Sequence, residues 1–129
     1  MILLRVIGIP KPQARPRVFQ VGGRVMAHSP KTSWFQAVYG RALESRPSEA
    51  YDAPLAANIE FIMPRPKSRK GAIWAAVRPD LDNLSKSIFD ALTQARWWTD
   101  DCRVVKSSQS KRYANDGEEP GVIVSVSVA

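Results

Sequence analysis

Two aspartates one residue apart, Asp80 and Asp82, lie in the stretch RPDLDNLSK, and Lys86 follows four residues after the second of them. In an α-helix, residues four apart share one side, so Asp82 and Lys86 are expected to lie together. Carboxylate oxygens bind hard divalent cations such as Mg²⁺, and an ammonium group can stabilise negative charge that develops on a phosphate. This combination is typical of a site for phosphodiester hydrolysis.

A second acidic pair, Asp100-Asp101, comes shortly after the same helical segment. Adjacent carboxylates repel each other unless a cation joins them, so this pair is also a candidate metal ligand. A purely structural interpretation is also open, in which Asp80 caps the helix, Asp82 complements the helix dipole and Lys86 forms an ion pair with Asp82. The acids by themselves therefore allow both a metal site and an ordinary helix start.

The elements that must position these residues follow from the apolar pattern. Helical spacing predicts one helix that begins with Ser29 as N-cap and Pro30 at the first helical position and ends at about Arg46, and a second helix from Asp80 to Ala95. Gly22-Gly23 predicts a tight turn between two short strands. Further strands are predicted at 2–9, 55–63, 104–105 with its flanks, and 122–128.

The predicted order is β, hairpin, α, β, α, β, β. It indicates one α+β domain over residues 1–129, with a small mixed sheet and two main helices packed on it. The single cysteine excludes an internal disulfide, and one cysteine with one histidine cannot form a His/Cys zinc site within one chain. The N-terminal apolar run is interrupted by Arg5 and ended by Pro10, so it is too short to cross a membrane and lacks the features of a signal peptide. A reducing cytosol fits this composition.

The balance of charge favours a polyanionic partner, with nucleic acid ahead of an anionic membrane surface. Lys and Arg number 19 against 12 Asp and Glu, which gives a formal net charge of +7 and a pI of about 10.0. Cations gather in the hairpin region and in the loop PRPKSRKG. From charge alone, the residues expected to contact the DNA backbone are Arg15, Arg17, Arg24, Arg65, Lys67, Arg69 and Lys70.

The acidic segment resembles the hallmark of the RusA family of Holliday junction resolvases, an Asp-x-Asp-Asn-Leu-x-Lys helix followed by Asp-Asp. The matching residues here are Asp80, Asp82, Asn83, Leu84, Lys86, Asp90 and Asp100-Asp101. The segments Gly8-x-Pro10, Arg15-Pro16-Arg17 and Ser29-Pro30-Lys31 also resemble phage and prophage members, so the resemblance covers nearly the whole chain.

This resemblance implies a RusA-like fold and a Mg²⁺-dependent homodimeric endonuclease, with Mn²⁺ as a possible metal. Such an enzyme nicks four-way DNA junctions symmetrically in DNA recombination and repair, and we expect it in the cytoplasm of a bacterial host. Carried over to this chain, the catalytic and metal-binding acids are Asp80, Asp82 and Asp101, with Asp100 as a further metal ligand and Lys86 essential for catalysis. The alternatives are a branched or flap DNA nuclease and a basic junction-binding protein that does not cut.

The length of the second helix raises a geometric problem for this site. Fifteen residues at 1.5 Å each separate Asp80 from the helix end by about 22 Å. Asp101 must therefore return along the helix or come from a partner subunit. We favour a site completed in the dimer, and a cluster within one chain is the competing arrangement.

Three further residue types are expected to be structural. Trp97-Trp98 is more consistent with the core at the end of the second helix than with stacking on unpaired bases. Cys102 is expected to be a small buried apolar residue, and His28 a surface or capping residue rather than a base.

Overall fold

A four-stranded mixed sheet forms the centre of the molecule. The computed structural model describes residues 1–13, 17–28 and 31–129, with side chains in the hairpin described for residues 20–25. The strands are β1 (Ile2–Ile7), β4 (Leu55–Met63), β5 (Val104–Tyr113) and β6 (Gly121–Val128), in the order β1-β6-β4-β5. All neighbours are antiparallel except β4 and β5, which are parallel, so the expected mixed sheet is confirmed.

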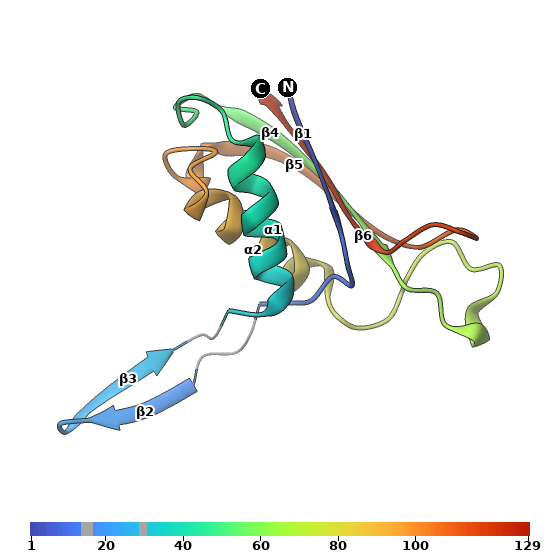
Figure 1. Ribbon diagram of the computed structural model, residues 1–129, viewed down its shortest axis with the longest axis horizontal. Helices are drawn as coiled ribbons and strands as arrows, with labels where there is room; N and C mark the ends of the chain where they lie inside the picture. Colours follow the sequence, from blue (N-terminus) through green and yellow to red (C-terminus); the bar gives the residue numbers. More distant parts are fainter. Residues whose placement is uncertain (14–16, 29–30) are drawn as a thin grey trace.

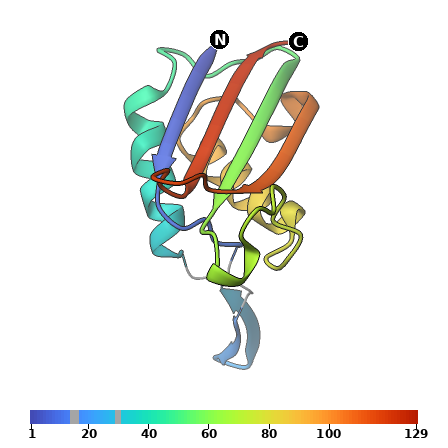
Figure 2. The same ribbon diagram turned by 90° about the vertical axis from the view of Figure 1, so that its right-hand side faces the viewer.

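Two helices, α1 (Ser33–Ser45) and α2 (Leu81–Gln94), cover one face of this sheet (Figures 1 and 2). The helix α2 connects the parallel strands β4 and β5, because a parallel pair needs a crossover rather than a tight turn. Two short 3₁₀ turns, η1 (Lys67–Arg69) and η2 (Asp101–Arg103), lie before α2 and before β5. The predicted α+β class and element order are thus confirmed.

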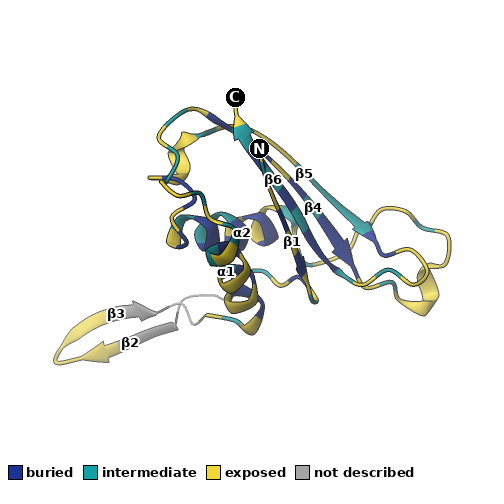
Figure 3. Cartoon of the chain, turned by 45° about the horizontal axis from the view of Figure 1, so that its top comes forward, coloured by how far each residue is buried: buried dark blue, intermediate teal, exposed yellow. Residues whose placement is uncertain are grey.

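The hydrophobic core lies between the sheet and the helices (Figure 3). Alternate residues of the strands point toward the helices, so Leu4, Val124 and Ile59 from three neighbouring strands are all buried. The helices contribute one apolar stripe each. These stripes consist of Trp34, Phe35, Val38 and Ala42 in α1 and Leu84, Ile88, Ala91 and Leu92 in α2.

The residues that follow α2 complete this core. Trp97 and Trp98 are both fully buried, which confirms the structural interpretation of this pair. The indole Nε1 of Trp97 donates to the backbone oxygen of Ala42 at 2.8 Å, and that of Trp98 donates to Oγ1 of Thr93 at 2.7 Å. Buried indole nitrogens generally need such partners, so these two rings are fixed in place and are inaccessible for stacking on DNA.

The predicted hairpin forms an arm that extends away from the sheet and helices (Figure 1). Its strands β2 (Arg17–Val21) and β3 (Arg24–His28) pair with each other around Gly22 and Gly23, which both adopt positive φ, 58° and 78°. Two consecutive positive φ values match a type I′ turn, the conformation that the Gly-Gly pair predicted. The residues from Gln20 to Val25 are all exposed.

Two local predictions were wrong. The first helix begins at Ser33, not at Pro30, and its N-cap is Thr32, whose Oγ1 accepts a hydrogen bond from the Phe35 backbone nitrogen at 3.0 Å. Ser29 and Pro30 themselves lie outside the described residues. Cys102 is exposed rather than buried, because it belongs to the 3₁₀ turn η2 and not to the strand. Among the described residues, neither helix combines the length and apolar character that crossing a membrane requires.

Candidate active site

The first turn of α2 carries the two aspartates of the acidic motif. Asp80 occupies the N-cap position, but its side chain makes no capping hydrogen bond. Asp82 lies in the first turn, where its carboxylate complements the helix dipole, and its Oδ1 accepts from the Asn83 backbone nitrogen at 2.9 Å. Both side chains are exposed. The capping role considered for Asp80 is therefore not observed, and its carboxylate oxygens are available to a ligand.

Lys86 lies one turn after Asp82 on the exposed side of α2. In the part of the chain that the structure describes, no ion pair joins Lys86 to Asp82 or to another acid. Its neighbours Ser85 and Ser87 are buried. The Oγ of Ser85 donates to Oε1 of Gln109 on β5 at 2.7 Å. The helix is thus held against β5 with Lys86 directed to solvent.

The segment that leads into Asp80 is anchored by Lys111, a residue that no motif or pattern had singled out. Its Nζ donates to the backbone oxygens of Val77 at 2.5 Å and Pro79 at 2.7 Å. The backbone around this contact is also tied to β5, since the Ala75 nitrogen donates to the Lys111 oxygen at 3.0 Å. Lys111 therefore fixes the peptide that immediately precedes Asp80.

The chain reverses direction after α2 and brings the second acidic pair back beside the helix. The turn is made at Arg96, which has a positive φ of 64°, and the Trp97 nitrogen donates to the Leu92 oxygen at 3.1 Å. The Trp98 ring then packs on Phe89, with ring centroids 5.9 Å apart. The residues that follow bring Asp101 close enough to Asp90 for the charge of Asp90 to raise the pKa of Asp101, so the second acidic pair lies beside the later part of α2.

Neighbouring groups shift the pKa values of the two carboxylates that follow α2, Asp100 and Asp101. Partial burial raises the pKa of Asp101, and a hydrogen bond with Asp100 and the charges of Asp100 and Asp90 raise it further. The pKa of Asp100 is lowered, chiefly because its Oδ1 accepts from the Cys102 backbone nitrogen at 3.0 Å. Asp90 accepts a hydrogen bond from Nε2 of Gln13 at 2.7 Å. Asp90 belongs to the motif, but no role was assigned to it from the sequence. It is the residue of α2 whose negative charge raises the pKa of Asp101.

The candidate acids therefore form two groups along α2 rather than one cluster. Asp82 and Asp90 are eight residues apart, which corresponds to about 12 Å along the helix axis. No group of three acidic, histidine or cysteine side chains suited to hold a metal ion occurs within residues 1–13, 17–28 and 31–129. Asp80 and Asp82 lie at one end of the row, and Asp90, Asp100 and Asp101 at the other, with Lys86 between them.

All the candidate ligands are carboxylates, so the donor set suits a hard cation such as Mg²⁺ or Mn²⁺ and not a soft one. Asp80 and Asp82 offer exposed oxygens, and the repulsion among the acids at the other end would be relieved by a cation. The residues present thus fit a divalent metal, although the described chain does not bring three of them to one point.

The basic loop after β4 contains one structural arginine and three exposed cations. Arg65 donates through Nε to the Ala114 oxygen at 3.0 Å and through Nη1 to the oxygens of Arg69 and Ala72, both at 2.7 Å. It therefore holds the loop together, and its bond to Ala114 joins this loop to a residue 49 positions later in the chain. The cations with exposed side chains in this loop are Lys67, Arg69 and Lys70.

Of the remaining predicted DNA contacts, only Arg24 has a side chain that the structure describes. Arg24 is exposed at the start of β3, next to the turn. Arg17 begins β2, but its side chain is outside the described part, and Arg15 lies outside the described residues altogether, as does the side chain of His28.

Comparison with known proteins gives a family match over most of the chain. Residues 8–127 match the model of the family described as endodeoxyribonuclease RusA. An uncharacterized protein of Bacillus subtilis (strain 168), YqaN, is 33% identical over 97% of this chain and 94% of its own length. A crossover junction endodeoxyribonuclease of Lactococcus phage r1t is 24% identical over 75% of this chain and 76% of its own length. The RusA enzyme of Escherichia coli (strain K12) is 64% identical over a shorter segment, 22% of this chain and 23% of its own length.

Proposed function

Because this chain belongs to the RusA family of endodeoxyribonucleases, we propose that it is a divalent-metal-dependent nuclease that resolves Holliday junctions by paired, symmetric nicks. The observation that carries this proposal is the family match over residues 8–127. The start of α2 agrees with it, because Asp80 makes no capping hydrogen bond and no ion pair among the described residues involves Asp80, Asp82 or Lys86. The names of the relatives support a four-way junction as substrate. We further propose that the protein acts on DNA in the cytoplasm of a bacterial host, in recombination and repair, and the phage origin of one relative is compatible with this location.

In this proposal, each part of the site has one task. Asp80, Asp82 and Asp101, with Asp100, would hold Mg²⁺, for which Mn²⁺ could substitute. The bound ion would lower the pKa of a coordinated water and offset negative charge on the phosphate. Lys86 lies near the reacting phosphate and stabilises the charge that develops on its oxygens. Lys67, Arg69 and Lys70 bind the DNA backbone together with the arginines of the arm, without reading sequence.

Cleavage of a synthetic four-way junction tests this proposal. We expect cleavage only with added Mg²⁺ or Mn²⁺, and we expect Asp82→Asn to lower the rate roughly 100-fold or more while junction binding persists, since only the reacting centre changes. Asp116→Asn is the matched control, because Asp116 is exposed in the turn before β6 and belongs to neither group of acids. Wild-type binding without cleavage in either metal would instead indicate a junction-binding protein.

The same assay separates a junction resolvase from a nuclease for other branched DNA. Junction, flap and linear duplex substrates of equal length are compared at one enzyme concentration. A strong preference for the junction, with nicks at equivalent positions on opposing strands, is expected if two sites are related by a two-fold axis. Equal cleavage of flap and junction would favour the branched-DNA nuclease.

We further propose that the active site is completed in a homodimer, with Asp101 supplied across the two-fold axis. The separation of Asp82 from the acids at the other end of α2 supports this arrangement, because one chain leaves the two groups about 12 Å apart along the helix. A mixture of Asp82→Asn and Asp101→Asn proteins tests it. If the sites are shared, a heterodimer has one intact site, and an equal mixture should recover about a quarter of wild-type activity. No recovery after verified subunit exchange would place each site within one chain.

A further inference from the structure

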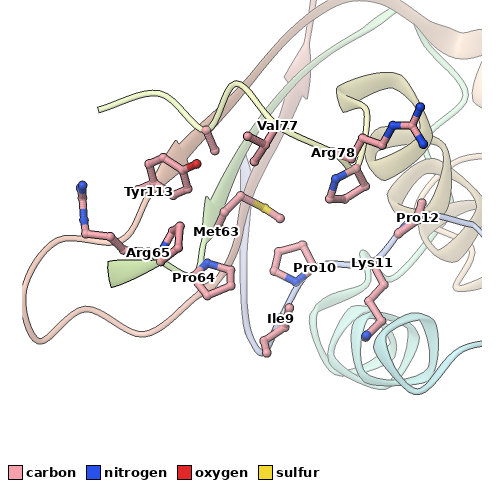
Figure 4. A pocket seen from close by; sticks show the side chains of 13 residues that line it. Ile9, Pro10, Lys11, Pro12, Met63, Pro64, Arg65, Val77, Arg78 and Tyr113 are labelled. Atoms are coloured by element: carbon pink, nitrogen blue, oxygen red, sulfur yellow. The ribbon is translucent and has the colours of Figure 1, made fainter. Parts of the chain in front are cut away.

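An apolar cavity opens to solvent directly before the first aspartate of the motif. Its volume is about 490 Å³, within the usual range for sites that bind a small molecule or a single ligand group. Pro79, which precedes Asp80 in the chain, is one of the residues that line it, so the cavity and the candidate active site adjoin. The buried residues Met63, Ala75 and Tyr113 form its floor. Figure 4 shows the Met63 side chain between Pro10 and Val77, pointing into the space.

The hydroxyl of Tyr113 faces this apolar space. Tyr113 as a whole is only 3% exposed, but its hydroxyl oxygen is not among the buried side-chain atoms that lack a partner, so it remains accessible from the cavity. The hydroxyl end of the ring points toward the cavity (Figure 4). The ring itself is held in place, since the Arg65 guanidinium lies 5.4 Å from its centroid and is bonded to three backbone oxygens. The cavity therefore offers a fixed donor or acceptor in an otherwise apolar wall.

The charges at the rim indicate which kind of ligand would enter. Lys11, Arg65 and Arg78 line the edge, and none of the described residues that line the cavity is acidic. A ligand with a flat apolar face, a polar edge and an attached anion would match the floor, the Tyr113 hydroxyl and the rim respectively. A nucleotide in a DNA strand has these three features, and an unpaired base can leave its stack to enter such a pocket.

We propose that this cavity binds one unpaired nucleobase of branched DNA beside the phosphate at Asp80. The inference rests on the proposed nuclease function and adds a contact that no residue of the acidic motif provides. The base would lie against Met63, Pro10 and Pro79 and hydrogen-bond the Tyr113 hydroxyl, while the rim cations contact its phosphates. Such a contact would favour a strand that is unpaired at the branch over a strand in a continuous duplex.

Methyl NMR of the full chain provides a direct test, because Met63 lies in the cavity and Met1, at 88% exposure, serves as an internal reference. The probe is a short single-stranded oligonucleotide, added without divalent metal so that no cleavage occurs, and a matched strand of abasic sites. We expect the bases to shift the Met63 methyl signal and the abasic strand to bind at least about tenfold more weakly. An equal shift with the abasic strand would overturn the proposal, because the contact would then be to phosphate alone. A Met63 shift that follows protein concentration rather than oligonucleotide would overturn it in favour of a second copy of the chain.

A pair of variants links the cavity to cleavage. Val77→Glu places an acid at the cavity wall, and Val128→Glu makes the same change at an exposed valine at the end of β6. We expect Val77→Glu to abolish the base-dependent Met63 shift and to lower kcat/KM for a junction at least about tenfold relative to Val128→Glu. If the wild-type protein cleaves the junction but the Met63 signal does not respond to the bases, the proposal of base binding in the cavity is rejected and the proposed nuclease function stands. If the bases shift the Met63 signal but no junction is cleaved, the proposed nuclease function is rejected and base binding in the cavity stands.

Discussion

Lys111 offers a way to disturb Asp80 without touching any proposed ligand. The Nζ of Lys111 bonds the oxygens of Val77 and Pro79, and Pro79 is joined to Asp80. The change Lys111→Met keeps most of the side chain's length and apolar stem but removes the charge and both hydrogen bonds. We expect the segment before α2 to loosen and the Asp80 carboxylate to lose its fixed position.

The size of the effect follows from these contacts. A hydrogen bond to a charged group contributes about 1.5 to 3 kcal/mol, but both bonds here share one partly exposed ammonium, so we expect a loss of about 2 kcal/mol rather than the sum. For a chain of this length, that corresponds to a fall in Tm of about 6 to 10 °C. A displacement of a reacting group by about 1 Å can cost roughly 100-fold in rate, so we expect cleavage to fall by about 10- to 100-fold.

The assay measures the junction-cleavage rate against Mg²⁺ concentration at a temperature where both proteins are folded. We expect Lys111→Met to raise the Mg²⁺ concentration for half-maximal rate, while the Kd for the junction in the absence of metal changes little. Lys106→Met is the matched control, because Lys106 lies on the same strand, is exposed and has no hydrogen-bond or ion-pair partner among the described residues. Lys111→Arg should restore part of the Mg²⁺ response.

One result would refute this reasoning. If Lys111→Met lowers the Tm as expected but matches Lys106→Met in both rate and Mg²⁺ response, Lys111 stabilises the loop without positioning Asp80. The site would then owe its geometry to α2 alone.

Three further predictions concern the fold and the DNA-binding surface. Hydrogen bonds from Arg112 and from the Asn115 backbone lower the pKa of Glu118 from 4.5 to about 2. The ionised Glu118 carboxylate therefore stabilises the folded state fully above about pH 4.5, and this contribution is lost as the pH falls toward 2. The Tm difference between wild type and Glu118→Gln should therefore be constant from pH 7 to about pH 5 and should shrink toward zero at lower pH. A difference that stays constant down to pH 2 would contradict the ion pair. Trp97→Phe removes the hydrogen bond to the Ala42 oxygen and opens a cavity, so urea denaturation should show a loss of about 2 to 4 kcal/mol, and a loss below about 1 kcal/mol would mean that the core adapts. Replacing Lys67, Arg69 and Lys70 with alanine should weaken junction and duplex binding alike and reduce the slope of log Kd against log salt by up to about 3, whereas an unchanged slope would place DNA elsewhere.

Local patterns predicted most of the fold. The alternation in β4, the Gly-Gly turn and the apolar stripe of α2 each depend on neighbours in the sequence, so the pattern contains the necessary information. The start of α1 was misplaced because Ser29-Pro30 has the composition of a helix start, whereas Thr32 makes the capping bond that the structure uses. Several residues with capping side chains close together leave the pattern ambiguous.

The site was less predictable because its connections are distant in the sequence. The motif identified Asp80, Asp82 and Lys86, but nothing in it indicates that Lys111 holds the preceding peptide or that Arg65 is bound to loop carbonyls. The position of Asp101 depends on a reversal at Arg96, a non-glycine residue with positive φ, and sequence patterns rarely signal such a residue. The proximity of Asp90 to Asp101 follows from that reversal and from the packing of Trp98 on Phe89.

The separation of the β2–β3 arm from the core affects how this protein can change over evolution. The exposed residues from Gln20 to Val25 add nothing to the buried core, so substitutions among them are nearly neutral for folding. Selection for new DNA or protein contacts can then act on the arm without loss of stability, while β4, β5 and α2 remain constrained by the core they share. Among relatives, the arm should therefore diverge faster than the helix that carries the acids, and exchanging arms between relatives should transfer binding preference without altering the thermal unfolding of the body.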